Sequence, residues 1–412
     1  MDRRLGRPGC YDADVRRHVA KELKGPRSSR ELVLTALRER GAMSRAELAR
    51  YAQVAPSTIS AVVQDLVAGG VVVGSGGPRA TQRPRTGRPG LRLTLNPGYG
   101  AVAGVEFGFR RLRVLLCDLA HDIIGAGECD LPDGHASAEG LAAARRLLDE
   151  TLAAAGLSHA ALIGAGVSLP GPIRHDPGAP DAVKPSGVLP GWHGVTGPDV
   201  EQALGVPVSI DNDANLAALG EHLWGAGRGC DDCVTVKFHY GIGCGLFVNG
   251  ALVRGAAGGA GELGHTTVDE RGPLCRCGKR GCLDSYAAIP AILDALRPQH
   301  GPLTLAGLMA LIARRDPGAV RVVSDAAGLV GRQLAIACNL LAPRRVVVVG
   351  AMAEAGEIVL GPLQAALRRD IAPNEPPELV PGALGTRHTA LGAIALALDE
   401  SDWLPSAARP SA

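Results

Sequence analysis

The stretch GHTTVDERGPLCRCGKRGCLD, residues 264–284, places one histidine and three cysteines among turn-forming glycine, proline and charged residues. His265 is followed ten residues later by Cys275, and then by Cys277 and Cys282. One imidazole and three thiolates form a closed tetrahedral set that is typical of structural zinc. The alternative is a group of loose surface thiols. The tight glycine turns beside Cys277 and Cys282 favour zinc, so we predict Zn²⁺ as a structural cofactor held by these four residues.

The composition is that of a folded chain with more than one domain. Its 412 residues leave room for two or three domains, and 46% of them are hydrophobic. No apolar run reaches the roughly 18 residues that a membrane span needs. The first residues, MDRRLGRPGCYDADVRRH, lack the apolar segment of a signal peptide. We therefore expect a cytoplasmic protein without a membrane partner, in which the 10 cysteines are free thiols or metal ligands rather than disulfides.

The N-terminal part of the chain is basic, although the net charge of the whole is only +2. Residues 1–96 contain 18 Lys and Arg against 8 Asp and Glu, which leaves an acidic remainder. Such an asymmetry predicts that the front part meets a polyanion, and nucleic acid is the polyanion that we expect. The alternative is an uneven distribution of charge between domains that has no functional cause.

The same part has the element order of a winged helix–turn–helix. Apolar residues recur at helical spacing in residues 28–40, and Ser44 with Glu47 forms a capping box at the start of a short second helix. After a turn, a longer helix begins near Pro56, and a strand follows at residues 71–73. In this arrangement the longer helix enters the major groove of double-stranded DNA.

Two groups of side chains are the candidate DNA contacts. At the start of the longer helix, short polar residues can reach phosphates or base edges: Ser57, Thr58 and Ser60. The segment 74–92 that follows is rich in glycine and proline and contains no acidic residue, which suits a phosphate backbone or a minor groove. Its arginines among our predicted contacts are Arg79, Arg83, Arg85 and Arg88. The alternatives are a generic helical domain and a basic linker without a partner, but the direct succession of the two groups favours DNA.

From residue 98 on, apolar strands alternate with helices rich in alanine and leucine. This alternation predicts an α/β fold with helices packed on parallel or mixed sheets, and its repetition predicts two related lobes with a cleft between them. We therefore assign residues 28–96 to the DNA-binding domain with its basic wing or linker, and residues 97–412 to the two-lobed domain. Residues 1–27 carry no motif, and we expect a disordered tail there.

Two groups of polar residues in the two-lobed domain are candidate ligand contacts. Asp211, Asn212 and Asp213 stand between a strand and a helix, where α/β folds place ligand-binding groups. A carboxylate at this place hydrogen-bonds a sugar hydroxyl or takes up its proton. Glu262 and His265 add a second polar pair. The residues alone leave open whether the first group binds a ligand or caps the helix.

Several motifs occur together and in a fixed order. They are GRP at 87–89, SLPGPI at 168–173, LPGW at 189–192, IDNDANLAALGE at 210–221, GAAGGAGELGH at 255–265 and CRCGKRGCLD at 275–284. With the helix–turn–helix before them, they resemble the ROK family of repressors, open reading frames and kinases over about residues 28–400. The resemblance implies an actin-like, two-lobed fold of the sugar kinase/Hsp70 type. Members with an N-terminal winged helix are transcriptional regulators, often repressors of sugar uptake or catabolism, and members without it are ATP-dependent sugar kinases.

The resemblance implies sugar contacts at Asn212, Asp213, Glu262 and His265, and it matches Asp213 to the catalytic base of the kinases. Asp284 falls where the family usually has glutamate. We include it among the predicted sugar-binding residues, although its shorter side chain leaves the identity of the sugar open. His265 and the three cysteines match the zinc ligands of the family. A metal there would fix the loop that carries Glu262 and would take no part in chemistry.

The loops that bind nucleotide phosphates in the family's kinases are altered in this chain. A DxGGT loop is replaced by EFGFR at residues 106–110, a GTGIG loop reads HYGIG at residues 239–243, and a late glycine pair reads Gly350–Ala351. Bulky side chains at these places block the close approach of backbone to phosphate. The changes favour a sensor over an enzyme, so we predict no catalytic residue.

The predicted function is a DNA-binding transcriptional regulator of carbohydrate metabolism or uptake, and more specifically a repressor. Its expected partners are a double-stranded DNA operator and a small-molecule sugar effector in the cleft, which would change lobe closure. A palindromic operator would match a homodimer or a higher homo-oligomer. The alternatives are an ATP-dependent sugar kinase with a DNA-binding appendage and a DNA-binding protein with a degenerate cleft.

Overall fold

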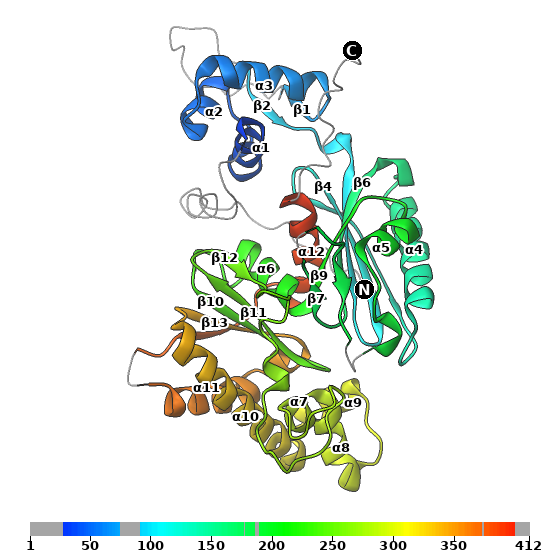
Figure 1. The fold of residues 1–412 in the computed structure, drawn as a ribbon, viewed down its shortest axis with the longest axis vertical. Coiled ribbons are helices and arrows are strands. Elements are labelled where there is room, and N and C mark those ends of the chain that lie inside the picture. Colours follow the sequence, from blue (N-terminus) through cyan, green and yellow to red (C-terminus); the bar gives the residue numbers. More distant parts are fainter. Residues whose placement is uncertain (1–27, 75–90, 177, 186–188, 373–374, 400–412) are drawn as a thin grey trace. The chain divides into compact units, whose positions relative to one another are not determined.

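The computed structural model (Figure 1) describes the following residues: 28–74, 91–176, 178–185, 189–372 and 375–399. The chain separates into two compact units between Tyr99 and Gly100, three residues after the predicted boundary. The predicted tail at residues 1–27 lies outside the described residues. Among the helices of the described ranges, none is long and apolar enough to cross a membrane.

The first unit has the element order of a winged helix–turn–helix, as the sequence predicts. Its elements are α1 (Ser29–Arg40), α2 (Arg45–Ala52), α3 (Pro56–Ala68), β1 (Val72–Gly74), β2 (Leu93–Leu95) and a 3-10 turn (Pro97–Tyr99). Strands β1 and β2 pair antiparallel. Capping boxes fix the starts of α1 and α2, because Ser28 and Ser44 exchange hydrogen bonds with Glu31 and Glu47.

The second unit contains two sheets, and the first has the order β5–β4–β3–β6–β9. Its strands are β3 (Ala101–Phe107), β4 (Arg111–Asp118), β5 (Ile123–Asp130), β6 (Leu162–Leu169) and β9 (Val208–Asn212). The pairs β5–β4 and β4–β3 are antiparallel, and the pairs β3–β6 and β6–β9 are parallel. Helices α4 (Ser137–Ala154) and α5 (Gly197–Leu204) pack on one face of this sheet. A short hairpin of β7 (Ile173–Arg174) and β8 (Ala182–Val183) follows β6, and 3-10 turns cover His159–Ala161 and Pro190–Trp192.

The second sheet has the order β12–β11–β10–β13–β14, and it repeats the pairing pattern of the first. Its strands are β10 (Cys233–Phe238), β11 (Ile242–Val248), β12 (Ala251–Val253), β13 (Arg345–Val349) and β14 (Glu378–Pro381). Two antiparallel pairs are again followed by two parallel pairs. The prediction of two related lobes is therefore confirmed.

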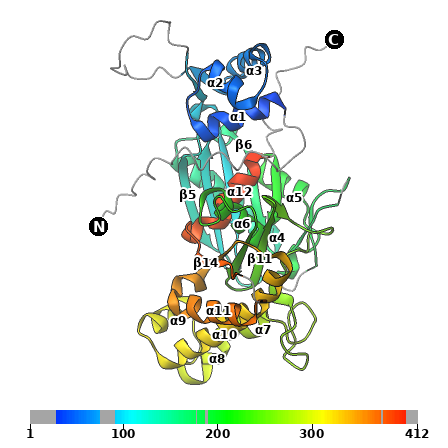
Figure 2. The ribbon, with the colours of Figure 1, turned by 90° about the vertical axis from the view of Figure 1, so that its left-hand side faces the viewer.

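The outer face of the second sheet is covered by α10 (Pro317–Leu341) and α11 (Glu357–Asp370), which bury Val234, Val236 and Phe238 beneath them. Three shorter helices, α7 (Asp284–Ala287), α8 (Ile289–His300) and α9 (Leu305–Ala313), pack beside α10. Figures 1 and 2 show all five helices at one end of the second unit. The remaining 3-10 turns are Leu263–His265, Ala351–Ala355 and Gly385–Arg387.

Two helices, α6 (Asp213–Trp224) and α12 (His388–Asp399), lie between the sheets. Helix α12 packs on β3 and β6 of the first sheet, and α6 packs on β10 and β11 of the second. The two helices also pack on each other through a shared apolar cluster that includes Leu216 and Ala393. The second unit is thus a five-layered stack in which one helix pair joins both lobes.

Glycine makes the close packing of these two helices possible. A side chain at Gly392 of α12 would overlap the carbonyl group of Leu216 in α6, and one at Gly220 would overlap that of His388. On the other side of α12, side chains at Gly104 and Gly166 would overlap its own carbonyl groups. The backbones therefore touch at positions where any Cβ atom would force them apart.

We expect the change Gly392→Ala to lower the free energy of unfolding by about 3 kcal/mol or more, because the new methyl group collides with rigid backbone. The matched control is Gly328→Ala in α10, where an added Cβ meets nothing within 4 Å. That change should raise the free energy of unfolding by about 0.5–1 kcal/mol through helix propensity. Urea unfolding of both variants measures the difference, and equal effects of the two would contradict the packing described above.

Candidate ligand cleft and metal centre

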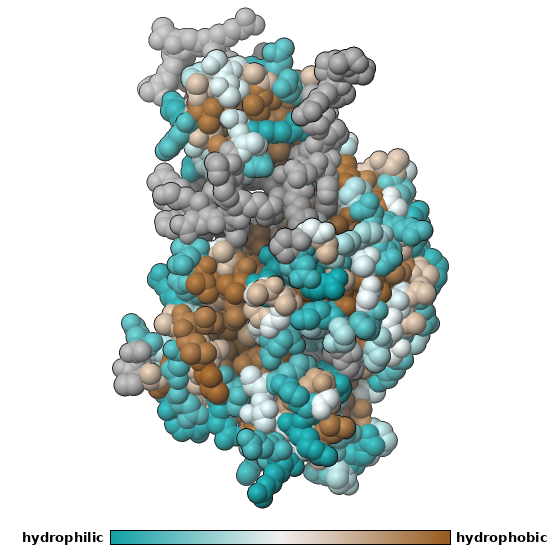
Figure 3. All heavy atoms as spheres, viewed as in Figure 1, coloured by the Kyte–Doolittle hydropathy of each residue, from teal (hydrophilic) through white to brown (hydrophobic). Residues whose placement is uncertain are grey.

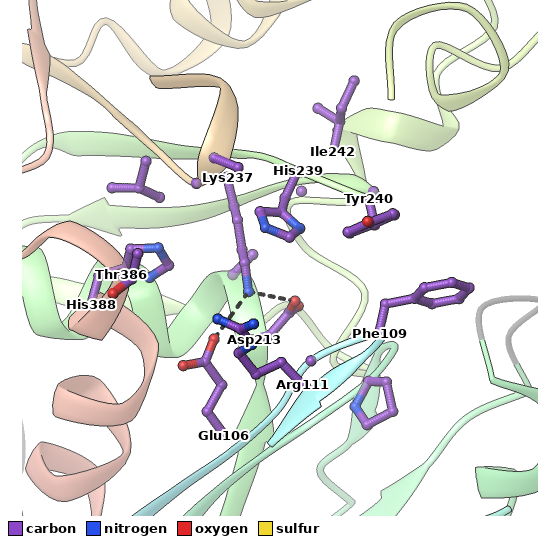
Figure 4. A pocket seen from close by; sticks show the side chains of 18 of the residues that line it. Glu106, Phe109, Arg111, Asp213, Lys237, His239, Tyr240, Ile242, Thr386 and His388 are labelled. Carbon is purple, nitrogen blue, oxygen red and sulfur yellow. Dashed lines mark hydrogen bonds and ion pairs between the residues drawn. The ribbon is translucent and has the colours of Figure 1, made fainter. Parts of the chain in front are cut away.

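A cavity of about 970 Å³ lies between the two lobes. It opens where several strands end, next to the β3–β4 turn, the β9–α6 junction and the β10–β11 turn (Figure 4). All five predicted sugar-binding residues line it: Asn212, Asp213, Glu262, His265 and Asp284. The structure therefore brings together residues that are up to 72 positions apart in the sequence.

Asn212 and Asp213 differ in how much of their polar surface is free for a ligand. Asn212 caps α6 by accepting the N–H of Ala214 at 2.9 Å, and its amide donates to the carbonyl group of Gly171 at 2.8 Å. The helix-capping alternative therefore describes Asn212. Asp213 begins the helix and points into the cavity, where one carboxylate oxygen accepts a hydrogen bond from Lys237 at 2.8 Å.

Lys237 is a charged residue in the otherwise apolar strand β10, and its side chain is only 10% exposed. Its Nζ lies 2.8 Å from Asp213, 3.9 Å from Glu106 and 3.4 Å from the hydroxyl group of Thr389. Burial works to lower the pKa of this ammonium group, but the charges of Asp213 and Glu106 outweigh burial and raise the pKa. Lys237 is therefore protonated at neutral pH.

The cavity also holds two buried imidazoles, His239 and His388. Burial and the nearby charge of Lys237 lower the pKa of His239 to about 4, and the same two causes hold the pKa of His388 well below its usual value. Both rings are consequently neutral at pH 7 and add no positive charge to the cleft.

Glu262 and Asp284 face the cavity from the second lobe, but they differ in how far their carboxyl groups are already engaged by other residues. Burial, together with the nearby carboxylates of Asp213 and Asp284, raises the pKa of Glu262 to about 7. Asp284 is engaged on both oxygens, since it accepts the N–H of Ile242 at 2.8 Å and a hydrogen bond from Arg276 at 2.9 Å. Asp284 consequently offers a ligand less than Glu262 does.

The four predicted metal ligands come together in one cluster. Nδ1 of His265 lies 3.7 Å from the sulfur of Cys275, and the sulfurs of Cys277 and Cys282 are 3.6 Å apart. All four ligand atoms lie within 4.8 Å of one another. Ligands placed 2.3 Å from a tetrahedral zinc would be about 3.7 Å apart, so the cluster has the size that a metal ion needs.

The metal cluster is connected to the cavity through His265. Its Nδ1 faces the cysteines, while its Nε2 lies 3.9 Å from a carboxylate oxygen of Glu262. A metal on Nδ1 would hold the ring in place and orient Glu262 from behind. The sequence assigned His265 to both the metal and the sugar, and the geometry places one ring nitrogen on each side.

The two altered loops, residues 106–110 and 239–243, each carry an aromatic side chain at the edge of the cavity. Phe109 follows β3 in the first lobe, Tyr240 follows β10 in the second, and their rings stack at a centroid distance of 5.4 Å and an angle of 22°. Figure 4 shows the two rings facing each other at the edge of the cavity. The bulky replacements seen in the sequence thus contact each other across the lobes.

The predicted DNA contacts lie in the first unit and are only partly described. Ser57, Thr58 and Ser60 are exposed on α3, although the hydroxyl group of Ser60 donates to the carbonyl group of Pro56 at 2.8 Å. Helix α3 contains no lysine or arginine, so any charged contact to phosphate would come from other segments. The predicted arginines, Arg79, Arg83, Arg85 and Arg88, lie outside the described residues.

Sequence reasoning missed the charged residues of the cluster around Lys237, which pairs with Asp213. Glu106, Arg113 and Lys237 lie on three different strands, and the only signal in the sequence is a lysine inside the apolar run VTVKF. An ionised residue in a buried strand needs a partner of opposite charge, so this lysine could have been recognised as part of a polar site.

Two equivalent sheets around a helix pair, with a cleft at the strand ends, define the actin-like class of two-lobed α/β proteins. The model of the ROK family matches residues 102–400, which is most of the chain. The chain therefore belongs to the ROK family.

Comparison with individual proteins gives both regulators and kinases. The chain is 27% identical to the xylose repressor of Bacillus subtilis (strain 168) over 376 residues, which cover 90% of this chain and 95% of the repressor. A crystal structure of a ROK family transcriptional regulator, a homolog of the E. coli MLC protein, covers 93% of this chain and 96% of its own with a TM-score of 0.72 at 24% identity. A ROK family glucokinase from Streptomyces griseus, solved with glucose and AMPPNP, covers 73% of this chain and 100% of its own with a TM-score of 0.62 at 28% identity.

We expect elemental analysis of the purified chain to find one tightly bound metal ion. The change Cys277→Ser should remove most of this metal and lower the melting temperature by several degrees. The metal would be lost because three ligands hold it more weakly than four, and the loop would lose its anchor. Cys129→Ser, which alters a half-buried thiol outside the cluster, is the control and should keep the metal. Equal metal contents in the two variants would show that the cluster is not the binding site.

Proposed function

We propose that this chain is a DNA-binding transcriptional regulator, and more specifically a repressor, whose effector is a sugar or a sugar derivative bound in the cleft. The observation that carries the proposal is a winged helix–turn–helix on the same chain as a ROK cleft whose nucleotide end is filled by the protein's own side chains. The comparisons support it, because the regulator structure covers nearly the whole chain while the glucokinase covers only 73% of it.

A sugar kinase is the second candidate, and Asp213 and the likeness to a glucokinase favour it. Two features of the cleft speak for a sensor instead. One carboxylate oxygen of Asp213 already accepts a hydrogen bond from the charged Lys237, so it is not free to accept a proton from a substrate hydroxyl. The stacked rings of Phe109 and Tyr240 occupy the mouth where glycine-rich loops would let backbone approach a phosphate.

Lobe closure is the expected link between the cleft and DNA. Contacts between the lobes already exist, since Arg254 of the second lobe donates to the fully buried Asp211 of β9 at 2.7 Å, and Lys184 donates to the carbonyl group of Ala257 at 3.2 Å. A ligand that hydrogen-bonds Asp213 at the β9–α6 junction and Glu262 of the second lobe would favour the closed arrangement. In a homodimer this would change the spacing of two winged helices, and we expect release from DNA.

The exposed apolar side chains of α10 support a homo-oligomer. Ile336 is 54% exposed and Leu340 is 80% exposed, one helical turn apart. Figure 3 shows apolar residues gathered on the surface of the second lobe. Apolar residues clustered on a surface are typical of an interface with another subunit.

For the metal cluster we propose zinc. Three thiolates and one imidazole suit zinc better than calcium or magnesium, which prefer oxygen ligands. Since all four positions of a tetrahedral ion would be taken by protein, the ion would be structural and would hold the loop that bears Glu262. The protein residues that meet the ligand would be Asn212, Asp213, Glu262 and, through Nε2, His265.

We expect the protein to bind the DNA upstream of its own gene, and one sugar from a panel of D-xylose, D-glucose, N-acetyl-D-glucosamine and their phosphate esters to weaken that binding at least about tenfold. Fluorescence anisotropy measures this at about 50 and about 200 mM salt, because phosphate contacts make affinity depend on salt. Binding that no sugar changes would support a degenerate cleft. Absence of DNA binding together with ATP turnover that Asp213→Ala abolishes would support the kinase.

We expect Asp213→Asn to reduce the sugar response at least about tenfold while DNA affinity stays unchanged, because a charged hydrogen bond to the ligand contributes about 1.5–3 kcal/mol. The control Asp294→Asn makes the same chemical change on the exposed surface of α8, where the carboxylate is 68% exposed. Anisotropy titrations with the active sugar compare the two. A normal response in Asp213→Asn would remove this residue from the ligand site.

A further inference from the structure

The basic residues that line the cleft are all paired with acidic ones. Five lysines and arginines of the described chain line the cavity: Arg110, Arg111, Arg113, Lys237 and Arg276. Their respective carboxylate partners are Asp133, Glu128 with Asp130, Glu106, Asp213 and Asp284. Since His239 and His388 are neutral, the lining offers a ligand no unpaired positive charge among its described residues.

The pairing is tightest at the inner end of the cavity. The side chains of Glu106 and Arg113 are only 12% and 13% exposed and meet at 3.0 Å, and Lys237 lies between Glu106 and Asp213 (Figure 4). Two cations and two anions form this inner cluster, so its net charge is zero. Arg113 also meets Glu128 on its outer side at 3.2 Å, which leaves no excess of positive charge there.

A phosphoryl group brings close to two negative charges into whatever site it enters. Proteins bind it with unpaired lysines and arginines, helix N-termini or glycine-rich backbone. Here the cations are taken, and the glycine-rich loops carry Phe109 and Tyr240. Placing a phosphate in the cleft would therefore cost desolvation without a compensating partner among the described lining residues.

We propose that Glu106, together with the Arg113 and Lys237 side chains that it neutralises, is the specificity-determining element of the cleft, and that it makes the protein accept an unphosphorylated sugar and reject phosphate esters and nucleotides. The inference rests on the proposed function for the sugar itself. Beyond that function, the inference states that the effector is uncharged and that Glu106 is the residue responsible for this preference. Lys237 is a positioning residue in this scheme, because it holds Asp213 as a hydrogen-bond acceptor for the sugar.

Glu106→Gln tests the proposal, since it removes one negative charge from the inner cluster and keeps an oxygen that accepts from Arg113. We expect the wild-type protein to bind the responsive neutral sugar at least about tenfold more tightly than its phosphate ester, as measured by calorimetry. In Glu106→Gln the affinity for inorganic phosphate and for the phosphate ester should rise at least about tenfold, a difference of about 1.4 kcal/mol.

Two further variants separate charge from shape and location. Glu106→Asp keeps the charge and should keep the rejection of phosphate. Glu354→Gln removes a charge from an exposed residue that lines the same cavity outside the inner cluster, and it should leave phosphate binding as weak as in the wild type. Melting curves confirm that each variant is folded before it is titrated.

The proposal is overturned if the wild-type protein binds a phosphate ester as tightly as the parent sugar, or if Glu106→Gln and Glu106→Asp bind inorganic phosphate equally. A wild-type protein that binds no sugar would instead overturn the proposed function. The titrations with inorganic phosphate need no sugar, so they still decide whether Glu106 sets the charge selectivity of the cleft.

Discussion

The close packing of α12 against two neighbours at once is the constraint on which the rest of the second unit depends. Gly104 and Gly166 let it lie directly on the first sheet, and Gly392 lets it touch α6 on its other side. Because α6 in turn packs on the second sheet, one helix pair sets the distance between the lobes. Asp213 stands at the start of α6, faces the cleft between the lobes and accepts a hydrogen bond there from Lys237.

The chemistry of the cleft follows from the bulky side chains that stand in two of its loops, at positions where phosphate-binding loops have small residues. A kinase needs a site that attracts phosphate and leaves its base free. This chain pairs each cation of the cleft with a carboxylate and stacks Phe109 on Tyr240 across the lobes. At another side of the cleft stands the carboxylate of Glu262, behind which lies the cluster of His265 and three cysteines. Among its described residues, the cleft thus keeps polar groups at one end and has stacked aromatic side chains at the other.

The sequence predicted best what depends on neighbouring residues. The winged helix follows from capping boxes at Ser44 and Glu47 and from helical spacing, and the metal cluster follows from four ligands within eighteen residues. The partners of Lys237 could not be predicted in this way, because Glu106, Asp213 and Thr389 lie on separate elements that only the fold brings together. For the same reason, the sequence could not show that both carboxylate oxygens of Asp284 already accept hydrogen bonds, one from the N–H of Ile242 and one from Arg276. Spacing identifies a set of ligands, but which groups remain free is decided by tertiary contacts.

The position of α12 in the chain has a consequence for folding during synthesis. Both sheets are complete in sequence once β14 ends at Pro381, yet α12, the helix that covers the first sheet from inside, begins only at His388. Until it emerges from the ribosome, the inner face of the first sheet stays exposed, with the glycines of β3 and β6 uncovered. Contacts between residues far apart in sequence form slowly, and exposed strands aggregate. The nascent chain is therefore most vulnerable just before α12 is made, and at that stage a chaperone would have the most apolar surface to cover.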